Sequence, residues 1–363
     1  MSRWRCVAVH YHDESRDRLV VEAVEPLFAR LGTAVPRAYH LRHWLRGPHL
    51  RLMFDVDDAA FDTTVLPLVE EVVGGFLVRH PSTTVLDPDR TLAQHRRLAE
   101  LEQIRDSLTP FRPDNSIREI PVDERIEVLG SATAAELLAE FHVATTPLAF
   151  AAARQTLAGS SLPTMAYDLM IASAHLLSSV GFARGFVSFR SHADAFLSWW
   201  PEAHGLRERW QDRYAAYRPE LLQRTKRLLS CLDTGSANGI TTWARTVEPV
   251  RRRGEALIRS GALSMDPPWA EVDLADPRNA DVVEMLRRSP FHRHALGERR
   301  PVHRTWFATY RLVLNYTYLY LTRLGLTPLH RFMLCHFAAN VAEELYGVAA
   351  ADVVLPAPTE VAG

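Results

Sequence analysis

The segment between residues 39 and 56 constrains the fold most, because apolar and polar side chains alternate in it around a tight turn. Residues 46–48 (RGP) are typical of a turn between two strands. Beyond the turn, four apolar side chains share one face of the expected strand: Leu50, Leu52, Phe54 and Val56. His49 and Arg51 project from the other face, about 7 Å apart.

An imidazole and a guanidinium on one strand face can hold a bound anion or a carbonyl group. The alternative is a half-buried strand whose polar face meets water. The residues alone leave both interpretations open.

Composition excludes several classes of partner. With 363 residues and 47% hydrophobic content, the chain can form one large or two modest cores. The formal net charge of -1 gives the whole protein no electrostatic footprint for nucleic acid. Positive charge comes almost entirely from arginine. Lys226 is the only lysine, which excludes Schiff-base and P-loop chemistry elsewhere in the chain.

The cysteines and the histidine pairs predict no metal site. The three cysteines lie far apart, and neither His10 with His12 nor His292 with His294 has a third ligand at a recognisable spacing. The N-terminal apolar run is too short for a signal peptide, and no window approaches a transmembrane helix. We therefore expect a cytoplasmic protein with no membrane partner.

The order of expected elements predicts an α+β fold. A strand over 4–11, a helix over 13–31 capped by Asp13, the two strands around the turn and a helix over 58–79 suggest a ferredoxin-like mixed sheet with helices on one face. Residues 110–121 read as a connector, and residues 125–129 as a short extended piece.

The remainder is predicted to be mainly helical. Expected helices cover these ranges: 132–158, 163–180, 205–232, 239–260, 281–288 and 303–324. Gly325 ends the last of these, and Thr327 with Pro328 begins a further helix that stops at Gly347. We expect a sheet subdomain (1–112), a mainly helical subdomain packed on it (113–350) and a disordered tail (351–363).

The closing helix concentrates tyrosines. Tyr316, Tyr320 and Arg323 fall on one face, and a neighbouring face carries Asn315, Tyr318 and Thr322. Phenols so close together need partners for their hydroxyl groups, and such groups can donate protons or hold an oxyanion. The alternative is a helix that packs aromatic surface with its hydroxyls at the rim.

Residues 188–193 (SFRSHA) form a third candidate region. Ser191 is expected to cap a helix, and His192 in its first turn would have its pKa lowered, which favours the neutral base. Arg190 lies beside them, and a surface cap is the alternative. There is no Walker A sequence, GxGxxG or GxSxG, so no nucleotide, flavin or serine-hydrolase site is expected.

Three short motifs then suggest a family. RGPHLRLMF (46–54) resembles the HxRxR-type strand of the C-terminal elimination domain of lantibiotic dehydratases, a family also called thiopeptide-type bacteriocin biosynthesis proteins. YLYLTRL (318–324) resembles that family's HMxxNRL helix. Residues 120–141 are similar to its PExxRYGG region and the helix that follows. The matches fall in family order and span most of the chain.

The departures from that pattern are informative. Family members that eliminate glutamate use two strand arginines, but here Arg51 is followed two residues later by Met53. Tyr318 takes the place of the helix histidine and Thr322 that of the asparagine, while Arg323 remains. A methionine does not bind a glutamate carboxylate. The chain therefore resembles the thiopeptide pyridine synthases more closely, a stand-alone branch that performs a formal aza-[4+2] cycloaddition.

The resemblance implies that two dehydroalanines of an azole-containing precursor peptide, bound with its leader, close into a pyridine and a macrocycle. Dehydration and loss of the leader complete the ring, with no cofactor. Proton transfer is assigned to Tyr318, with Tyr316 or Tyr320, and to His192. Arg51 and His49 would stabilise charge on the reacting amide. Further substrate-binding residues are expected to be Arg190, Ser191, Asn315 and Arg323.

Other interpretations stay open at this point. A glutamate-eliminating lyase of the same superfamily is the nearest, and a non-catalytic leader-binding scaffold is a second. The third is an unrelated α+β protein with an accidental resemblance. A homodimer is left open as well.

Overall fold

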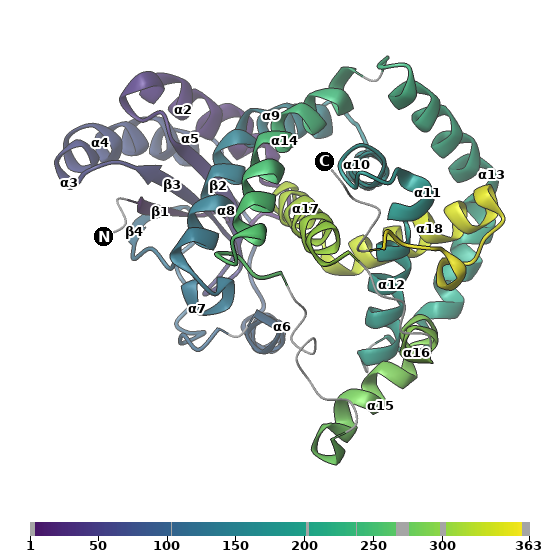
Figure 1. Ribbon diagram of the computed structural model, residues 1–363. Coiled ribbons are helices and arrows are strands. Elements are labelled where there is room, and N and C mark those ends of the chain that lie inside the picture. Colours follow the sequence, from purple (N-terminus) through teal and green to yellow (C-terminus); the bar gives the residue numbers. More distant parts are fainter. Residues whose placement is uncertain are drawn as a thin grey trace. The chain divides into compact units, whose positions relative to one another are not determined.

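The alternating segment forms two neighbouring strands in the computed structural model, β2 (Ala38–His43) and β3 (His49–Asp55). The structure describes residues 4–102, 104–200, 203–236, 238–265, 276–297 and 303–357. The chain divides into two units, and Figure 1 labels the helices and strands that belong to them. The first comprises residues 1–125, 142–160 and 323–325, and the second comprises residues 126–141, 161–322 and 326–363. The expected division at residue 112 stays a prediction, and residues 358–363 of the expected tail lie outside the described residues.

The first unit contains an antiparallel sheet. Its strands are β1 (Trp4–His10), β2, β3 and β4 (Ser116–Ile120), in the order β2-β3-β1-β4. The α+β class is confirmed, but the expected mixed sheet is wrong, because all three strand pairings are antiparallel. The tight turn makes β2 and β3 antiparallel. The helical connection from β1 to β2 skips β3, and the one from β3 to β4 skips β1. The skipped strand in each case runs antiparallel to both of its neighbours.

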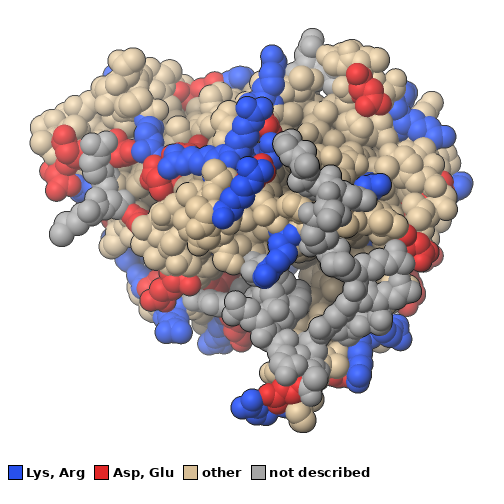
Figure 2. Space-filling model, in the orientation of Figure 1, with Lys and Arg blue, Asp and Glu red and all other residues tan. Residues whose placement is uncertain are grey.

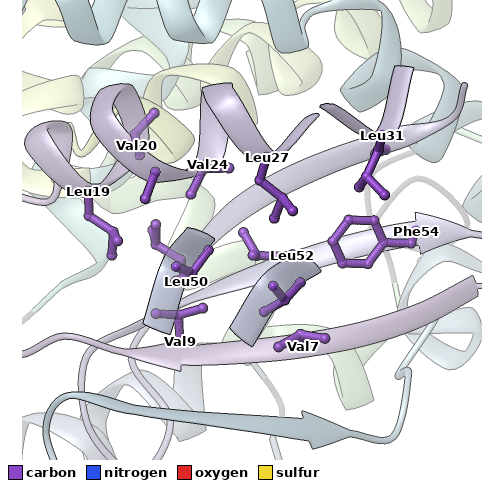
Figure 3. Close-up of a cluster of buried hydrophobic side chains, with 14 of the residues drawn as sticks. Val7, Val9, Leu19, Val20, Val24, Leu27, Leu31, Leu50, Leu52 and Phe54 are labelled. Carbon is purple, nitrogen blue, oxygen red and sulfur yellow. The ribbon is translucent and has the colours of Figure 1, made fainter. Parts of the chain in front are cut away.

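Two helical segments cover one face of this sheet. One runs through α1 (Asp17–Leu19), a π-helical stretch (Val20–Val24) and α2 (Glu25–Leu31). The other extends from α3 (Asp58–Ala60) to α5 (Gly75–Arg79). Figure 3 shows side chains of the first segment pointing at the strands. The buried cluster includes Val7, Val9, Leu19, Leu27, Leu50, Leu52 and Phe54. Apolar alternation in β3 therefore builds the core of this unit.

Two neighbouring assignments are wrong in the connector region. Residues 116–120 form the edge strand β4, paired with β1, where a connector was expected. Residues 126–129 form the short helix α7 (Ile126–Leu129), where an extended piece was expected. An edge strand with one neighbour tolerates polar side chains on both faces, so SIREI lacks the apolar alternation of a central strand.

Two helix boundaries also differ from the prediction. Asp13 does not cap the first helix, which begins at Asp17; its carboxylate accepts hydrogen bonds from Ser82 and Thr84 instead. The expected helix over 132–158 is two helices, α8 (Ala132–Ala144) and α9 (Thr146–Leu157). Pro147 at the start of α9 lacks the amide hydrogen that a continuous helix needs.

Helices make up most of the second unit. They include α10 (Leu162–Leu176), α12 (Val187–Trp199), α13 (Leu206–Asp233), α14 (Asn238–Arg259), α16 (Pro290–Gly297), α17 (Arg304–Leu324) and α18 (Pro328–Tyr346). The predicted start of α18 is confirmed, because the Thr327 side chain accepts from the His330 amide, and Gly347 ends the helix with φ 64°. No helix among the described residues is long and apolar enough to cross a membrane.

One glycine sets the approach of α14 to α17. A Cβ atom on Gly254 would lie 2.2 Å from Cδ2 of Leu312 and 3.4 Å from Cδ2 of Leu137. Any other residue there would displace the Leu312 side chain, so the absence of a side chain permits this close packing.

Leu52→Ala should lower the free energy of unfolding by about 2–5 kcal/mol, because it leaves a cavity beneath the helices in a fully buried position. Urea denaturation measures the loss. Val78→Ala is the matched control, since that side chain is 83% exposed and its truncation should change stability little. Equal effects of the two substitutions would contradict the assignment of the core.

Candidate functional site

The polar face of β3 carries a row of imidazoles. His49 lies opposite His10 of β1 and His43 of β2 in the strand register. Its ring centroid is 4.7 Å from that of His10 and 5.2 Å from that of His43. As predicted, His49 and Arg51 lie on the face of β3 opposite its apolar side chains. Arg51 Nε lies 3.4 Å from His49 Nε2. The sequence did not reveal the row, because it depends on the pairing register.

Burial keeps this row uncharged. His49 Nδ1 lies 2.9 Å from the Gly47 carbonyl oxygen, but desolvation dominates and lowers the pKa of His49 to about 3. Desolvation likewise lowers the pKa of His10 to about 4. Arg51 is then the cation of the row. In the described part of the chain, no three His, Cys, Asp or Glu side chains are arranged to hold a metal ion.

Arg323 is held within the first unit. Its side chain is 2% exposed and donates to the His142 carbonyl oxygen at 2.9 Å and to Thr146 Oγ1 at 2.8 Å. Its Nη2 also lies 3.3 Å from His40 Nδ1. These contacts favour a structural role, and the predicted contact with substrate stays a prediction.

The tyrosines of α17 separate into two environments in the second unit. Tyr316 packs against Phe141, with ring centroids 4.8 Å apart, and Tyr320 packs against Trp243 at 4.7 Å. Both side chains are buried among aromatic rings. Burial raises the pKa of Tyr316. Tyr318 lies in a different environment.

Tyr318 pairs with His192 of α12. The Tyr318 hydroxyl lies 2.8 Å from His192 Nδ1, and the two rings meet edge to face with centroids 5.4 Å apart. The hydroxyl also lies 3.4 Å from Cys335 Sγ, and the Arg331 guanidinium carbon lies 4.9 Å from the centre of the phenol ring. Of the residues predicted for this unit, the structure thus brings His192 and Tyr318 together.

Both members of the pair are neutral near pH 7. Desolvation, reinforced by Arg331, lowers the pKa of His192 to about 3. Desolvation and the neighbouring Cys335 raise the pKa of Tyr318 well above its usual value. The predicted direction for His192 is therefore confirmed. The expected cause, a position in the first turn of a helix, is wrong, because α12 begins at Val187 and His192 lies in its second turn. Burial lowers the pKa instead.

Ser191 does not cap a helix, because it lies inside α12. Its Oγ lies 3.0 Å from His292 Nε2, and His292 Nδ1 lies 2.6 Å from Ser289 Oγ. Arg190 donates through Nη2 to Glu343 and Asn340, both at 2.6 Å. Asn315 is half-buried on α17.

Sequence reasoning did not place Arg331 or Cys335 in the site, and it weighed His292 only as a metal ligand. Arg331 and Cys335 share α18 and stand four residues apart, which places them on one face of that helix. This spacing could have marked a candidate face. His292 offered no comparable pattern, because its contact with Ser191 spans about a hundred residues of chain.

The comparisons with known proteins bear on the whole chain. The family model described as lantibiotic biosynthesis dehydratase C-term matches residues 4–342, so the resemblance inferred from the three motifs is confirmed. The search of curated proteins gave no match.

Two solved structures resemble the fold. The one titled "Pyridine synthase, TbtD, from thiomuracin biosynthesis" is 36% identical, covers 96% of this chain and 100% of its own, and has a TM-score of 0.78. TsrL is 19% identical, covers 97% of both chains, and has a TM-score of 0.65. The second likeness concerns the fold alone.

Arg323→Met should destabilise the protein by about 3 kcal/mol, because it removes the charged donor from the buried acceptors at His142 and Thr146. Chemical denaturation checks this value. Arg30→Met, which removes an exposed ion pair with Glu71, should have little effect. A stable Arg323→Met protein would contradict the structural role.

Acid should destabilise the fold. Six histidines have pKa values lowered to about 3 or 4: His10, His49, His142, His192, His292 and His336. The unfolded chain binds protons below about pH 6.5 while the folded chain does not, so stability falls as the pH drops toward 4.

Each of these groups should contribute on the order of 1–2 kcal/mol to the loss between about pH 7.5 and about pH 5. Urea unfolding at the two pH values measures it. His142→Phe preserves a ring to stack on Tyr39 and should show a smaller loss. An equal free energy of unfolding at the two pH values would contradict the assignment of these imidazoles as neutral.

Proposed function

Proceeding from the lantibiotic biosynthesis dehydratase C-term family, to which this chain belongs, we propose that the protein is a thiopeptide pyridine synthase. The carrying observation is the 36% identity with a pyridine synthase over 96% of this chain and the whole of that one. We propose that its substrate is a ribosomal peptide with azoles, two dehydroalanines and a leader. The reaction joins the dehydroalanines by a formal aza-[4+2] cycloaddition.

Two positions weigh against glutamate elimination. Met53, 7% exposed, stands where an eliminating member has its second strand arginine, and a thioether offers no charge to a carboxylate. Tyr318 stands where such a member has its histidine. The imidazole is supplied instead by His192, from a different helix. This exchange supports different chemistry on the same fold.

We assign proton transfer to the His192–Tyr318 pair. In the tautomer that we propose, the Tyr318 hydroxyl donates to His192 Nδ1, and His192 Nε2 carries the ring proton. His192 is the more exposed of the two and meets the substrate. During loss of water, Nε2–H protonates the departing hydroxide while the phenol proton passes to Nδ1. The proton that carbon of the new six-membered ring then loses passes to His192 Nε2, and Nδ1 returns its proton to the Tyr318 phenolate. Both residues thus regain their starting protonation states.

Arg331 stabilises the phenolate in this relay. Its guanidinium lies 4.9 Å from the phenol ring, so a full positive charge is already in place when negative charge develops on Tyr318. Such preorganised charge in a dry site lowers the energy of a charged intermediate without reorganising solvent. Cys335 Sγ, 3.4 Å from the hydroxyl, fixes the orientation of the phenol.

In the first unit we propose that Arg51 and His49 bind a polar group of the peptide. Arg51 is the cation beside neutral imidazoles, so it attracts a carbonyl oxygen or an anion. Arg190, Ser191 and Asn315 stay substrate-binding candidates of the second unit. The sheet, with its β-α-β-β-α-β order, is proposed to be ferredoxin-like, and the cytoplasmic location stays a prediction.

Orientation supplies much of the rate in this proposal. Holding the two ends of one peptide in a reactive geometry is worth roughly 7–11 kcal/mol, and general acid–base help adds about 10²–10⁴-fold. None of the proposed steps requires a cofactor, because aromatisation follows from eliminations.

Incubation with a dehydroalanine-bearing precursor tests the function. Mass spectrometry should show a smaller cyclic product together with the leader as a carboxamide. Incubation with a glutamylated peptide is the counterpart, and repeated losses of glutamate there would establish the lyase instead. Binding without conversion of either peptide would establish the scaffold.

Tyr318→Phe should lower kcat by about 10²–10⁴-fold with little change in peptide affinity, because it removes only the relayed proton. His192→Phe should have a similar effect, and the double variant should be no worse, since the two groups act as one unit. Tyr316→Phe is the matched control and should retain turnover. Unchanged turnover in Tyr318→Phe would show that this tyrosine is structural.

A further inference from the structure

Arg331 of α18 is a cation to which the described part of the chain gives no acidic partner. Its side chain is half-buried, and its Nε is buried without a hydrogen-bond partner. Among the described residues, its guanidinium forms no ion pair and donates to no protein acceptor. Two aromatic rings contact it instead: the guanidinium carbon lies 4.9 Å from the centre of the Tyr318 ring and 4.9 Å from that of Phe332.

Other arginines of the second unit are neutralised. Arg190 pairs with Glu343, and Arg207 pairs with Asp194. Figure 2 shows Asp and Glu side chains interspersed with Lys and Arg on one face of the molecule. Taking a guanidinium out of water is unfavourable, and cation–π attraction offsets only part of that cost. Arg331 therefore keeps a planar fork of N–H donors for an acceptor that the described residues do not supply.

This cation lies beside the proposed proton relay. It contacts the ring of Tyr318, whose hydroxyl lies 2.8 Å from His192 Nδ1. Its charge also acts on His192, where it adds to the effect of desolvation in lowering the pKa of the imidazole. An oxygen atom that accepts a proton from His192 is therefore stabilised by the charge of Arg331 as well.

The proposed reaction contains one oxygen atom that needs such a cation. The two dehydroalanine alkenes supply four ring carbons, and the amide nitrogen of one dehydroalanine supplies the fifth ring atom. The sixth is the carbonyl carbon bonded to that nitrogen, so its oxygen must leave as water before the ring becomes aromatic. Negative charge gathers on this oxygen when the amide loses its N–H proton, and again when the C–O bond breaks.

Resting on the proposed function, we propose that Arg331 is a catalytic residue whose guanidinium binds this amide oxygen beside His192. The amide N–H proton moves to the oxygen, and Arg331 stabilises the negative charge in between. After ring closure the C–O bond breaks with its electron pair, and the oxygen takes the Nε2 proton of His192 and leaves as water. A ring C–H returns a proton to His192, so one water is lost and no oxidant is needed.

A double variant separates contact with the substrate from an effect through Tyr318 alone. In Tyr318→Phe the phenolate cannot form, so any role of Arg331 that acts only on the phenolate is already lost. Adding Arg331→Met, which keeps an unbranched stem between the rings, should lower kcat for pyridine formation by a further factor of about 10². No further loss would overturn the contact with the amide oxygen and confine Arg331 to Tyr318.

Two further variants control for charge and folding. Arg213→Met removes an exposed arginine of α13 and should leave kcat unchanged. Arg331→Lys keeps the positive charge but not the planar fork, so it should be about tenfold more active than Arg331→Met. If circular dichroism shows that Arg331→Met does not fold, Arg331→Lys in the Tyr318→Phe background replaces it, with an expected further loss of about tenfold. An unchanged kcat there overturns the proposal.

Acetate tests the cation without turnover, because a carboxylate mimics the charged amide oxygen and fits the guanidinium fork. The NMR line width of isotope-labelled acetate should rise saturably with the parent protein and with Arg213→Met, and much less with Arg331→Met at equal ionic strength. Equal broadening by the parent and Arg331→Met overturns the proposal. Acetate binding that depends on Arg331, in a protein that forms no pyridine, would refute the proposed function and retain the anion site.

Discussion

The two-residue period of β3 is the constraint on which the first unit depends. Leu50, Leu52 and Phe54 are fully buried under the helices, so the same backbone must present His49 and Arg51 on the opposite face. A slip of one residue would place a guanidinium in the core and leucines in the polar row. The free energy of burying the apolar face therefore also fixes the register of the candidate binding groups.

Sequence predicted best what local pattern determines. Neighbouring residues determine both the alternation in β3 and the start of α18, and both predictions are confirmed. The edge strand β4 was missed because its identity comes from pairing with β1, which lies more than a hundred residues away. Asp13 is a similar case: it looks like a cap, yet its carboxylate is taken by Ser82 and Thr84 from a distant loop. Tertiary partners override local preference in these places.

The candidate site divides in the same way. The sequence singled out Tyr318 and His192 as candidate site residues, but it did not reveal the hydrogen bond between them, which joins residues 126 positions apart. The lowered pKa of His192 was expected from a helix terminus and comes instead from desolvation, which no local pattern records. The sequence did not single out Arg331 and Cys335, because their importance comes from contact with Tyr318 on another helix.

The surroundings of Tyr316, Tyr318 and Tyr320 on α17 favour Tyr318 for the proton transfer that we propose. Tyr316 and Tyr320 pack against aromatic rings, whereas the hydroxyl of Tyr318 lies 2.8 Å from an imidazole nitrogen. Burial moves the two pKa values apart, downward for His192 and upward for Tyr318, so neither group ionises alone near pH 7. A proton therefore leaves the imidazole most easily when another arrives from the phenol. In the relay that we propose, the cation of Arg331 lowers the free energy of the phenolate, which favours coupled transfer of the two protons.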